Sequence, residues 1–171
     1  MILVTAFEPF GGKTTNASLN ILNQLADRYD KLVLPVDVKT IRDCLYQKDL
    51  TSYDMVIMLG EADRPNISLE QFAYNELTMR IKDNQGYQVF GQTIIDGGQT
   101  LKTPLQLDHL LDEDTVISTD PGRYLCNMGY YLALNKTENV VFIHVSTKDS
   151  DKQTKRVEAI IYEIEQVSKS W

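Results

Sequence analysis

Three side chains, Cys126, His144 and Glu70, are of the types that together perform nucleophilic catalysis. Cys126 lies in the segment GRYLCN, directly after the turn pair Pro121-Gly122 and at the start of a run with helical character. His144 ends the apolar run VVFIHV, and Glu70 follows the apolar run MVIMLG. A thiol nucleophile needs a base, and an imidazole base needs a carboxylate to orient it. The three residues therefore predict a Cys-His-Glu triad.

Each of these residues also has a purely structural interpretation. A cysteine on a helix usually packs in the core, as the segment IRDCLYQ around Cys44 illustrates, and a histidine at a strand end is often a hydrogen-bonded structural residue. Cys126, however, falls in the first turn of its predicted helix, where unpaired backbone N–H groups favour a thiolate and lower the pKa of a cysteine. The second histidine, His109, lies in the helix-like and exposed run LQLDHLLDED.

The elements that would position these residues alternate between strands and helices. Short apolar runs without polar alternation are typical of strands buried on both faces. Helices between such strands indicate a single α/β domain over residues 1–171, with three α/β/α layers and a largely parallel, twisted central sheet of the phosphorylase/hydrolase-like type. Strands are predicted over 2–7, 31–38, 55–60, 115–119 and 140–145, and helices over 17–28 (with Asn16 as N-cap), 39–49, 104–112, 126–135 and 152–168. The segment 72–103 is predicted to be a hairpin or a long loop outside this pattern.

Ligands of such sheets bind at the carboxyl ends of the strands. Three separate strand ends offer a glutamate, a cysteine and a histidine, so we expect Glu70, Cys126 and His144 to meet in one cleft.

The composition excludes several classes of function. The chain has a net charge of −7, with 43% hydrophobic and 24% charged residues, which is ordinary for a globular protein and disfavours nucleic acids and anionic membranes as partners. No apolar run is long enough to span a bilayer, and the N-terminal segment does not resemble a signal peptide. Two scattered cysteines and two scattered histidines show no metal-ligand spacing. We therefore expect a cytoplasmic protein with free thiols, no metal and no cofactor.

Several short motifs, all in the same order, resemble those of the pyroglutamyl peptidase I (pyrrolidone-carboxylate peptidase) family of cysteine peptidases. VTAFEPFGG followed by NAS is similar to the opening of that family, and MVIMLGEADRPNISLEQFAYN is similar to its strand, turn and glutamate segment. MRIKDNQG, GRYLCN and VFIHV are similar to the segments that carry the family's arginine, cysteine and histidine. The resemblance covers residues 2 to about 145.

This resemblance implies an acyl-transfer hydrolase that removes an N-terminal pyroglutamyl residue from a small peptide with a blocked N-terminus. Cys126, His144 and Glu70 would form the triad. Arg80 and the backbone N–H of Cys126 would both be candidates for stabilising the oxyanion. It also implies that a homo-oligomer, a dimer or a tetramer, is formed.

Substrate binding is where the sequence departs from the family pattern. Phe7 and Phe10 keep the aromatic pair that would stack on the lactam ring, and backbone groups near Glu61 would bind its amide edge. Glu61, however, replaces a glutamine, and Asp63 and Arg64 replace two glycines. A cysteine amidase or aminopeptidase for another small N-terminal group is therefore one alternative, and a non-catalytic binding protein on the same fold is another.

Overall fold

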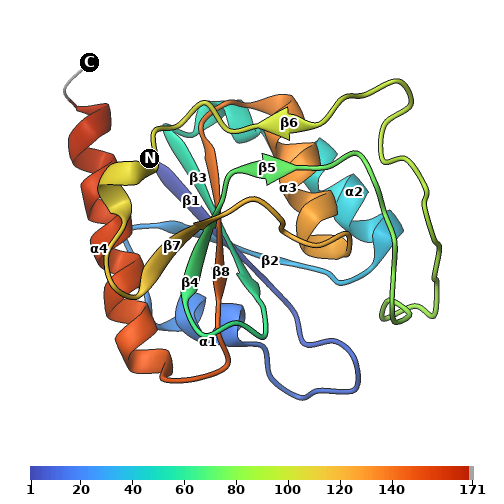
Figure 1. Cartoon of the computed structure of the whole chain (residues 1–171), viewed down its shortest axis with the longest axis horizontal. Coiled ribbons are helices and arrows are strands. Elements are labelled where there is room, and N and C mark those ends of the chain that lie inside the picture. The colour runs from blue at the N-terminus through green and yellow to red at the C-terminus, as the bar shows by residue number, and fades with distance from the viewer. Residues whose placement is uncertain (170–171) are drawn as a thin grey trace.

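A six-stranded sheet lies between two layers of helices in the computed structural model, which describes residues 1–169 (Figure 1). The strand order is β2-β1-β3-β8-β4-β7. The first four of these strands are mutually parallel, β4 runs antiparallel to β8, and β7 is parallel to β4. This confirms the predicted α/β fold with a largely parallel sheet. The strands are β1 (Ile2–Phe7), β2 (Asp30–Leu34), β3 (Met55–Glu61), β4 (Ile67–Glu70), β7 (Thr115–Ser118) and β8 (Val140–Val145).

Alternate side chains of the strands build two separate cores, one on each face of the sheet. Helices α1 (Ala17–Gln24) and α4 (Ser150–Ser168) cover one face, where they bury the leucine and isoleucine stripes expected from the sequence. Helices α2 (Val38–Gln47) and α3 (Leu125–Lys136) cover the other face. Asn16 caps α1 as predicted, because its side-chain oxygen accepts a hydrogen bond from the backbone N–H of Ser18 at 2.9 Å.

Helix α3 is buried along almost its whole length, which fixes the position of Cys126 near its start. Gly129 lets this helix approach α2 closely, since a Cβ atom there would lie 3.3 Å from Ile41 of that helix. The Asn127 side chain pairs with the backbone N–H and C=O of Tyr74 at 2.8 and 2.9 Å. The start of α3 is therefore tied to the segment that passes over it.

That segment, residues 72–103, is a long excursion from the sheet, as predicted. Its two ends pair as the short antiparallel strands β5 (Phe72–Ala73) and β6 (Leu101–Lys102). Between them the chain loops outward on the α2 and α3 side of the molecule, to the right in Figure 1.

One predicted element of the fold is wrong, and one strand was not predicted. Residues 104–112 do not form a helix, because one 3-10 turn, η2 (Asp108–Leu110), is enough to bury Leu107 and Leu110 in the core on the α1 and α4 face of the sheet. A second such turn, η1 (Leu50–Ser52), precedes β3. Strand β4 was not predicted at all. All four of its residues are buried, including Ser68 and Glu70, so its polar residues concealed the apolar run that marks a buried strand.

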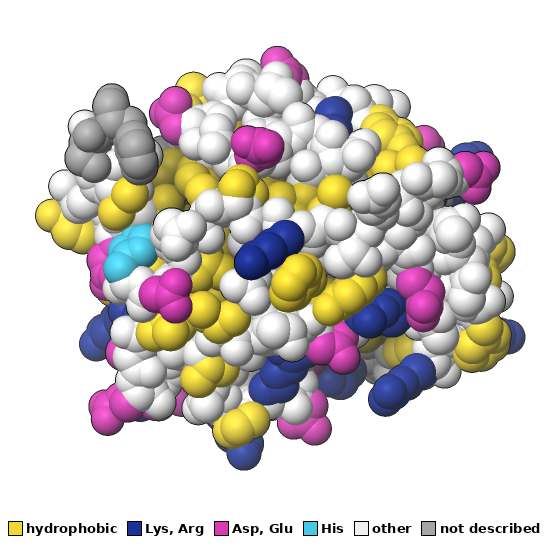
Figure 2. Space-filling model, turned by 45° about the horizontal axis from the view of Figure 1, so that its top comes forward, with side chains coloured by type: hydrophobic (Ala, Val, Ile, Leu, Met, Phe, Trp, Pro, Cys, Tyr) yellow, Lys and Arg dark blue, Asp and Glu magenta, His cyan; other side chains and the backbone are white. Residues whose placement is uncertain are grey.

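The surface carries charges of both signs. On the face shown in Figure 2, basic and acidic side chains are interspersed with small apolar patches. No helix within residues 1–169 combines the length and the apolar character that a membrane crossing requires.

Candidate active site

Cys126 and His144 lie on the same face of the sheet. Gly60 of β3 is paired in register with His144 of β8, and a Cβ atom built on Gly60 would lie only 2.9 Å from the Cys126 sulfur. Paired residues of neighbouring parallel strands direct their side chains to the same face. The thiol therefore sits over Gly60, next to the strand position from which the imidazole projects.

Glu70 reaches the same imidazole from β4. Its Oε1 atom lies 2.8 Å from His144 Nδ1, and the two residues are 0% and 3% exposed. Because Glu70 is a carboxylate, Nδ1 carries the proton and donates it, which leaves Nε2 as the acceptor. Phe142 packs against the imidazole with ring centroids 4.7 Å apart. The predicted histidine and glutamate are thus brought together and held.

The protonation states follow from burial and from this hydrogen bond. Burial lowers the pKa of His144, although the Glu70 hydrogen bond opposes that shift. Burial works to raise the pKa of Glu70, but the hydrogen bond and charge of His144, with Ser118 and Arg64, outweigh it and the pKa is lowered. The resting pair is therefore a neutral imidazole beside an ionised carboxylate.

The thiol behaves differently from the sequence-based expectation. Burial, reinforced by the charges of Glu70 and Glu61, raises the pKa of Cys126 to about 12. The position of Cys126 at a helix start was expected to lower its pKa, but desolvation of the thiol where it packs over Gly60 outweighs that effect. Within residues 1–169, no hydrogen bond joins the Cys126 thiol to the imidazole. A neutral thiol next to a neutral imidazole favours proton transfer during bond formation rather than a preformed ion pair.

Arg64 belongs to this network, which the sequence did not indicate. Its Nη1 atom donates to Glu70 Oε1 at 2.6 Å and to Ser118 Oγ at 3.1 Å. The two charged residues are six positions apart, a spacing that matches no regular period. Only recognition of β4 as a strand beside β7 could have placed them together.

The residues predicted to hold the substrate lie in different surroundings. Phe7 is 1% exposed and packs against Phe142, with ring centroids 6.4 Å apart. Phe10 is half-buried and packs on Tyr124, with ring centroids 5.6 Å apart. Phe7 thus forms part of the wall behind the thiol, and Phe10 covers the loop that leads to α3.

Glu61 directs its carboxylate away from the thiol. It follows Gly60 in β3, so its side chain points to the opposite face, toward α1. There Oε2 accepts a hydrogen bond from the backbone N–H of Ala17 at 2.7 Å, and Oε1 pairs with Lys13 Nζ at 2.9 Å. The pairing of β3 with β1 ends at Met58 and Thr5. The Glu61 backbone therefore lies beyond the last β3 residue that is paired with β1.

Arg80 is not brought into contact with the triad. It is exposed, and within residues 1–169 it makes no hydrogen bond or ion pair. Its segment nevertheless borders the site, since Thr78 N donates to Arg123 O at 2.8 Å and Tyr124 Oη donates to Lys82 O at 3.2 Å.

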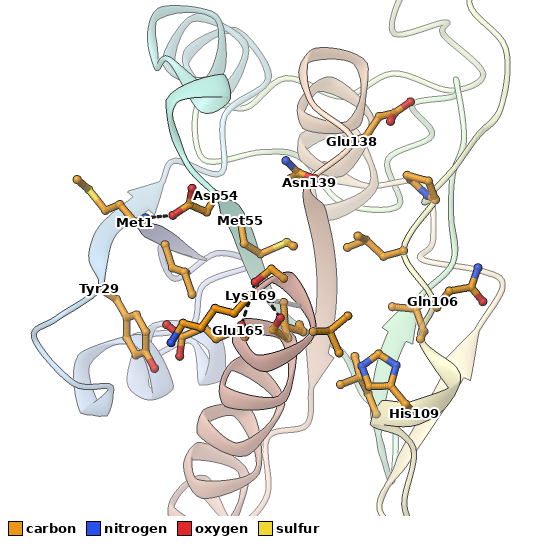
Figure 3. A pocket seen from close by; sticks show the side chains of 18 of the residues that line it. Met1, Tyr29, Asp54, Met55, Gln106, His109, Glu138, Asn139, Glu165 and Lys169 are labelled. Atoms are coloured by element: carbon orange, nitrogen blue, oxygen red, sulfur yellow. Dashed lines mark hydrogen bonds and ion pairs between the residues drawn. The ribbon is translucent and has the colours of Figure 1, made fainter. Parts of the chain in front are cut away.

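A large hollow lies elsewhere, at the amino ends of the strands. It has a volume of about 870 Å³ and is bordered by Ile2, Met55 and Asn139, each at the start of a parallel strand. Figure 3 shows His109 and Gln106 on one side of this hollow and Tyr29 on the other. Within residues 1–169, no three histidine, cysteine, aspartate or glutamate side chains are grouped as metal ligands.

The fold and the site together have the form of an α/β cysteine hydrolase, with thiol, imidazole and carboxylate on one sheet face. The family model described as pyroglutamyl peptidase matches residues 1–150, and the chain therefore belongs to that family of cysteine peptidases. The resemblance seen in the sequence motifs is confirmed.

Individual relatives agree with this assignment. A pyrrolidone-carboxylate peptidase of Thermococcus onnurineus is 28% identical over 99% of this chain and 97% of its own length. One from Pyrococcus furiosus is 33% identical over 78% of this chain and 72% of its own length. The crystal structure of pyrrolidone carboxyl peptidase from Thermus thermophilus superimposes with a TM-score of 0.88 and 30% identity, covering 94% of this chain and 98% of that one.

Proposed function

We propose that this protein is a cysteine peptidase that removes an N-terminal pyroglutamyl residue from peptides. The observation that carries the proposal is the His144–Glu70 hydrogen bond of 2.8 Å on the sheet face where the Cys126 sulfur covers Gly60. A buried imidazole oriented by a carboxylate beside a thiol is the arrangement that acyl transfer through sulfur requires. Membership of the pyroglutamyl peptidase family supplies the substrate class.

The reaction begins with acylation of the thiol. The Cys126 sulfur bonds to the carbonyl carbon of the pyroglutamyl residue while its proton passes to His144 Nε2, and the carbonyl electrons move onto oxygen. When this intermediate collapses, the C–N bond breaks and the imidazolium returns the proton to the leaving amine. Glu70 holds the ring and stabilises the transient imidazolium, as the third member of such triads does.

Water then completes the cycle. A water molecule attacks the thioester carbon and gives a proton to His144 Nε2. The C–S bond breaks, the thiol is protonated again, and pyroglutamate leaves. The unpaired backbone N–H of Cys126 in the first turn of α3 is the proposed oxyanion donor. Arg80 is a second candidate donor, which its position on a segment bordering the site supports.

Recognition of the ring is proposed to use Phe7 and Phe10 as apolar walls and the Glu61 backbone as a donor and acceptor for the lactam amide. The Glu61 carboxylate already accepts hydrogen bonds from Lys13 and the Ala17 backbone. It therefore offers no free negative charge to a substrate with a charged amino group. This favours the neutral pyroglutamyl ring over the alternative, an amidase or aminopeptidase for another small N-terminal group.

Hydrolysis of pyroglutamyl-coumarin beside a panel of aminoacyl-coumarins tests the proposal. We expect release of coumarin from the pyroglutamyl substrate, loss of release in Cys126→Ala, and little change in Cys44→Ala. Cys44 is the matched control, because it is the other free cysteine and lies on α2. Turnover of an aminoacyl substrate alone would indicate the alternative hydrolase, and no turnover of any substrate would indicate a binding protein.

We further propose that the chain forms one domain and assembles as a homo-oligomer in the cytoplasm. Both hydrophobic cores are built on the same sheet, which supports a single domain. The two cysteines are free, which is compatible with a reducing compartment. Light scattering coupled to size-exclusion chromatography measures the assembly state, and a monomer at micromolar concentration would contradict the oligomer.

A further inference from the structure

The Arg64 guanidinium connects three parts of the candidate site. Nη1 donates to Glu70 Oε1 at 2.6 Å and to Ser118 Oγ at 3.1 Å, and Nη2 donates to the backbone oxygen of Asp120 at 2.6 Å. The arginine side chain is 30% exposed, whereas the Glu70 side chain that it contacts is fully buried. Arg64 therefore reaches inward from the surface to a carboxylate that water does not reach.

The Glu70 carboxylate is held through a single oxygen. Oε1 accepts hydrogen bonds from both His144 Nδ1 and Arg64 Nη1, whereas Oε2 is buried and has no hydrogen-bond partner within residues 1–169. A carboxylate held by the imidazole alone could rotate about its terminal torsion, which has a broad energy minimum. The second hydrogen bond restricts that rotation.

The same guanidinium fixes the turn that leads to the nucleophile. Ser118 ends β7 opposite Glu70, and Asp120 begins the turn, where its carboxylate accepts a hydrogen bond from Gly122 N at 2.9 Å. Gly122 has φ of 80°, a left-handed conformation suited to glycine, and α3 with Cys126 begins directly afterwards. Arg64 thus ties the position of Glu70 to the path of the chain into α3.

We propose that Arg64 is a positioning residue of the triad. It sets the orientation of the Glu70 carboxylate and the position of that carboxylate relative to the turn before Cys126. The inference rests on the proposed function for its kinetic consequences, but the positioning itself does not depend on the substrate. Arg64 also adds a positive charge near His144, whose other charged neighbour is Glu70, and this charge lowers the pKa of the imidazole. Arg64 therefore helps to keep His144 unprotonated as a base.

Steady-state kinetics on pyroglutamyl-coumarin with Arg64→Gln and Arg64→Lys test the proposal. For Arg64→Gln we expect kcat to fall on the order of 100-fold, the loss typical of a misplaced catalytic group, with KM changed less than about threefold. The acid limb of the pH profile should move to higher pH. Arg64→Lys should return the acid limb to its wild-type position, because the charge is restored, but only part of kcat, because an ammonium lacks the fork that reaches three acceptors.

Two other arginines provide controls. Arg28→Gln removes a distant ion pair with Glu165, so it reports the effect of losing a surface arginine. Arg123→Gln removes contacts to Asp120 and Gly122 but none to Glu70. Both should keep kcat within about threefold of wild type. A loss in Arg123→Gln equal to that in Arg64→Gln would overturn the proposal, since turn stability alone would then explain the effect. Full kcat in either Arg64 variant would overturn it as well.

A measurement without substrate separates this inference from the proposed function. The chain has two histidines, so NMR of ¹⁵N-histidine-labelled protein follows His144 with His109 as an internal reference. We expect the titration midpoint of His144 to rise in Arg64→Gln and to return in Arg64→Lys, with His109 unchanged. An unchanged His144 midpoint in a folded Arg64→Gln protein would overturn the inference. Failure of wild type to cleave the substrate would refute only the proposed function.

Discussion

The two ends of the central sheet carry the same types of side chain in opposite surroundings. At the carboxyl ends of β3 and β8, His144 is 3% exposed and hydrogen-bonded to the buried Glu70. At the amino ends, His109 and Glu138 are exposed residues on the border of the hollow of about 870 Å³. The histidine at the carboxyl ends is fixed by its neighbours, whereas the histidine at the amino ends is exposed and borders the hollow shown in Figure 3.

This difference shows that burial and partners, rather than the size of a hollow, identify the candidate chemistry. A buried imidazole and carboxylate lose their hydration and are retained only when they satisfy each other. Within residues 1–169, His109 has no hydrogen bond or ion pair that would fix its tautomer. A base must present one defined nitrogen to its substrate, which His144 can do and His109 cannot.

Exchange of each histidine for glutamine tests this comparison with the largest expected effect. In His144→Gln, activity on pyroglutamyl-coumarin should fall by about 10⁴-fold or more, because the thiol loses its base. In His109→Gln, kcat and KM should stay within about twofold of wild type. A larger loss in His109→Gln than in His144→Gln would place the chemistry at the hollow, and no loss in His144→Gln would refute the triad.

The position of the Cys126 thiol at the carboxyl ends of the strands depends on Gly60. A Cβ atom there would approach Phe142 to 2.6 Å and the Cys126 sulfur to 2.9 Å, so Gly60→Ala must displace one of them. We expect kcat to fall on the order of 100-fold and the free energy of unfolding to fall by about 1–3 kcal/mol.

Gly129→Ala is the matched control for this variant. Its added methyl group enters the same core but meets Ile41 no closer than 3.3 Å, and alanine is the better helix former. Activity should remain near wild type and stability should not fall by more than about 1 kcal/mol. Chemical denaturation and steady-state kinetics on both variants separate displacement of the thiol from simple overpacking.

The pH dependence of stability sharpens the comparison, because the pKa values of His144, Glu70 and Cys126 are all shifted in the folded protein. The pKa of His144 is lowered from 6.5, so the unfolded chain binds a proton more readily and stability should fall as pH drops below about 6.5. The lowered pKa of Glu70 adds a loss below about 4.5. The pKa of Cys126 is raised from 9.0 to about 12, so stability should also fall as pH rises above about 9.

Each proton taken up or released contributes about 1.4 kcal/mol per pH unit to these losses. Urea denaturation at a series of pH values measures them. Cys126→Ala should reduce the alkaline loss by the amount that one proton contributes. Cys44→Ala should have a smaller effect, since the pKa of Cys44 is raised less strongly. An alkaline limb unchanged in Cys126→Ala would contradict the buried, protonated thiol.

The sequence predicted the parts of this site that carry strong local patterns. The runs ILVTAF, MVIMLG and VVFIHV fixed three central strands, and the turn before α3 placed Cys126 at a helix start. These patterns depend on apolar periodicity and on turn residues, both of which are local. Glu70 was assigned to the site through a strand end, and it does lie at one, although the strand is β4 rather than the predicted run before it.

The remaining parts depend on tertiary contacts that no local pattern encodes. β4 is short and half polar, so its register with β8 could not be inferred, and the role of Arg64 depends on that register. The raised pKa of Cys126 could not be predicted from the sequence either, because it results from burial of the thiol over Gly60 rather than from the helix that carries the residue. The apolar spacing of residues 104–112 matched a helix, yet one turn sufficed to bury its leucines.

The smallest expected effect concerns Glu61, the conspicuous charged replacement near the substrate. Its side chain is 8% exposed and faces α1, where it accepts a hydrogen bond from the Ala17 backbone and pairs with Lys13. In Glu61→Gln, activity on pyroglutamyl-coumarin should therefore change less than about threefold, because the backbone that would bind the ring is kept. Stability should fall by about 0.3–1 kcal/mol, the contribution of a charge at a helix N-terminus.

Lys13→Gln separates the two contacts of that carboxylate. The Lys13 side chain is 57% exposed, so its removal should cost less than Glu61→Gln, which also weakens the contact with α1. Thermal denaturation and kcat/KM of both variants test this order. A large rise of pyroglutamyl activity in Glu61→Gln would instead mean that the carboxylate turns toward the substrate in solution. The neutral ring would then be poorly matched to this site, and substrates with a free amino group would become the better candidates.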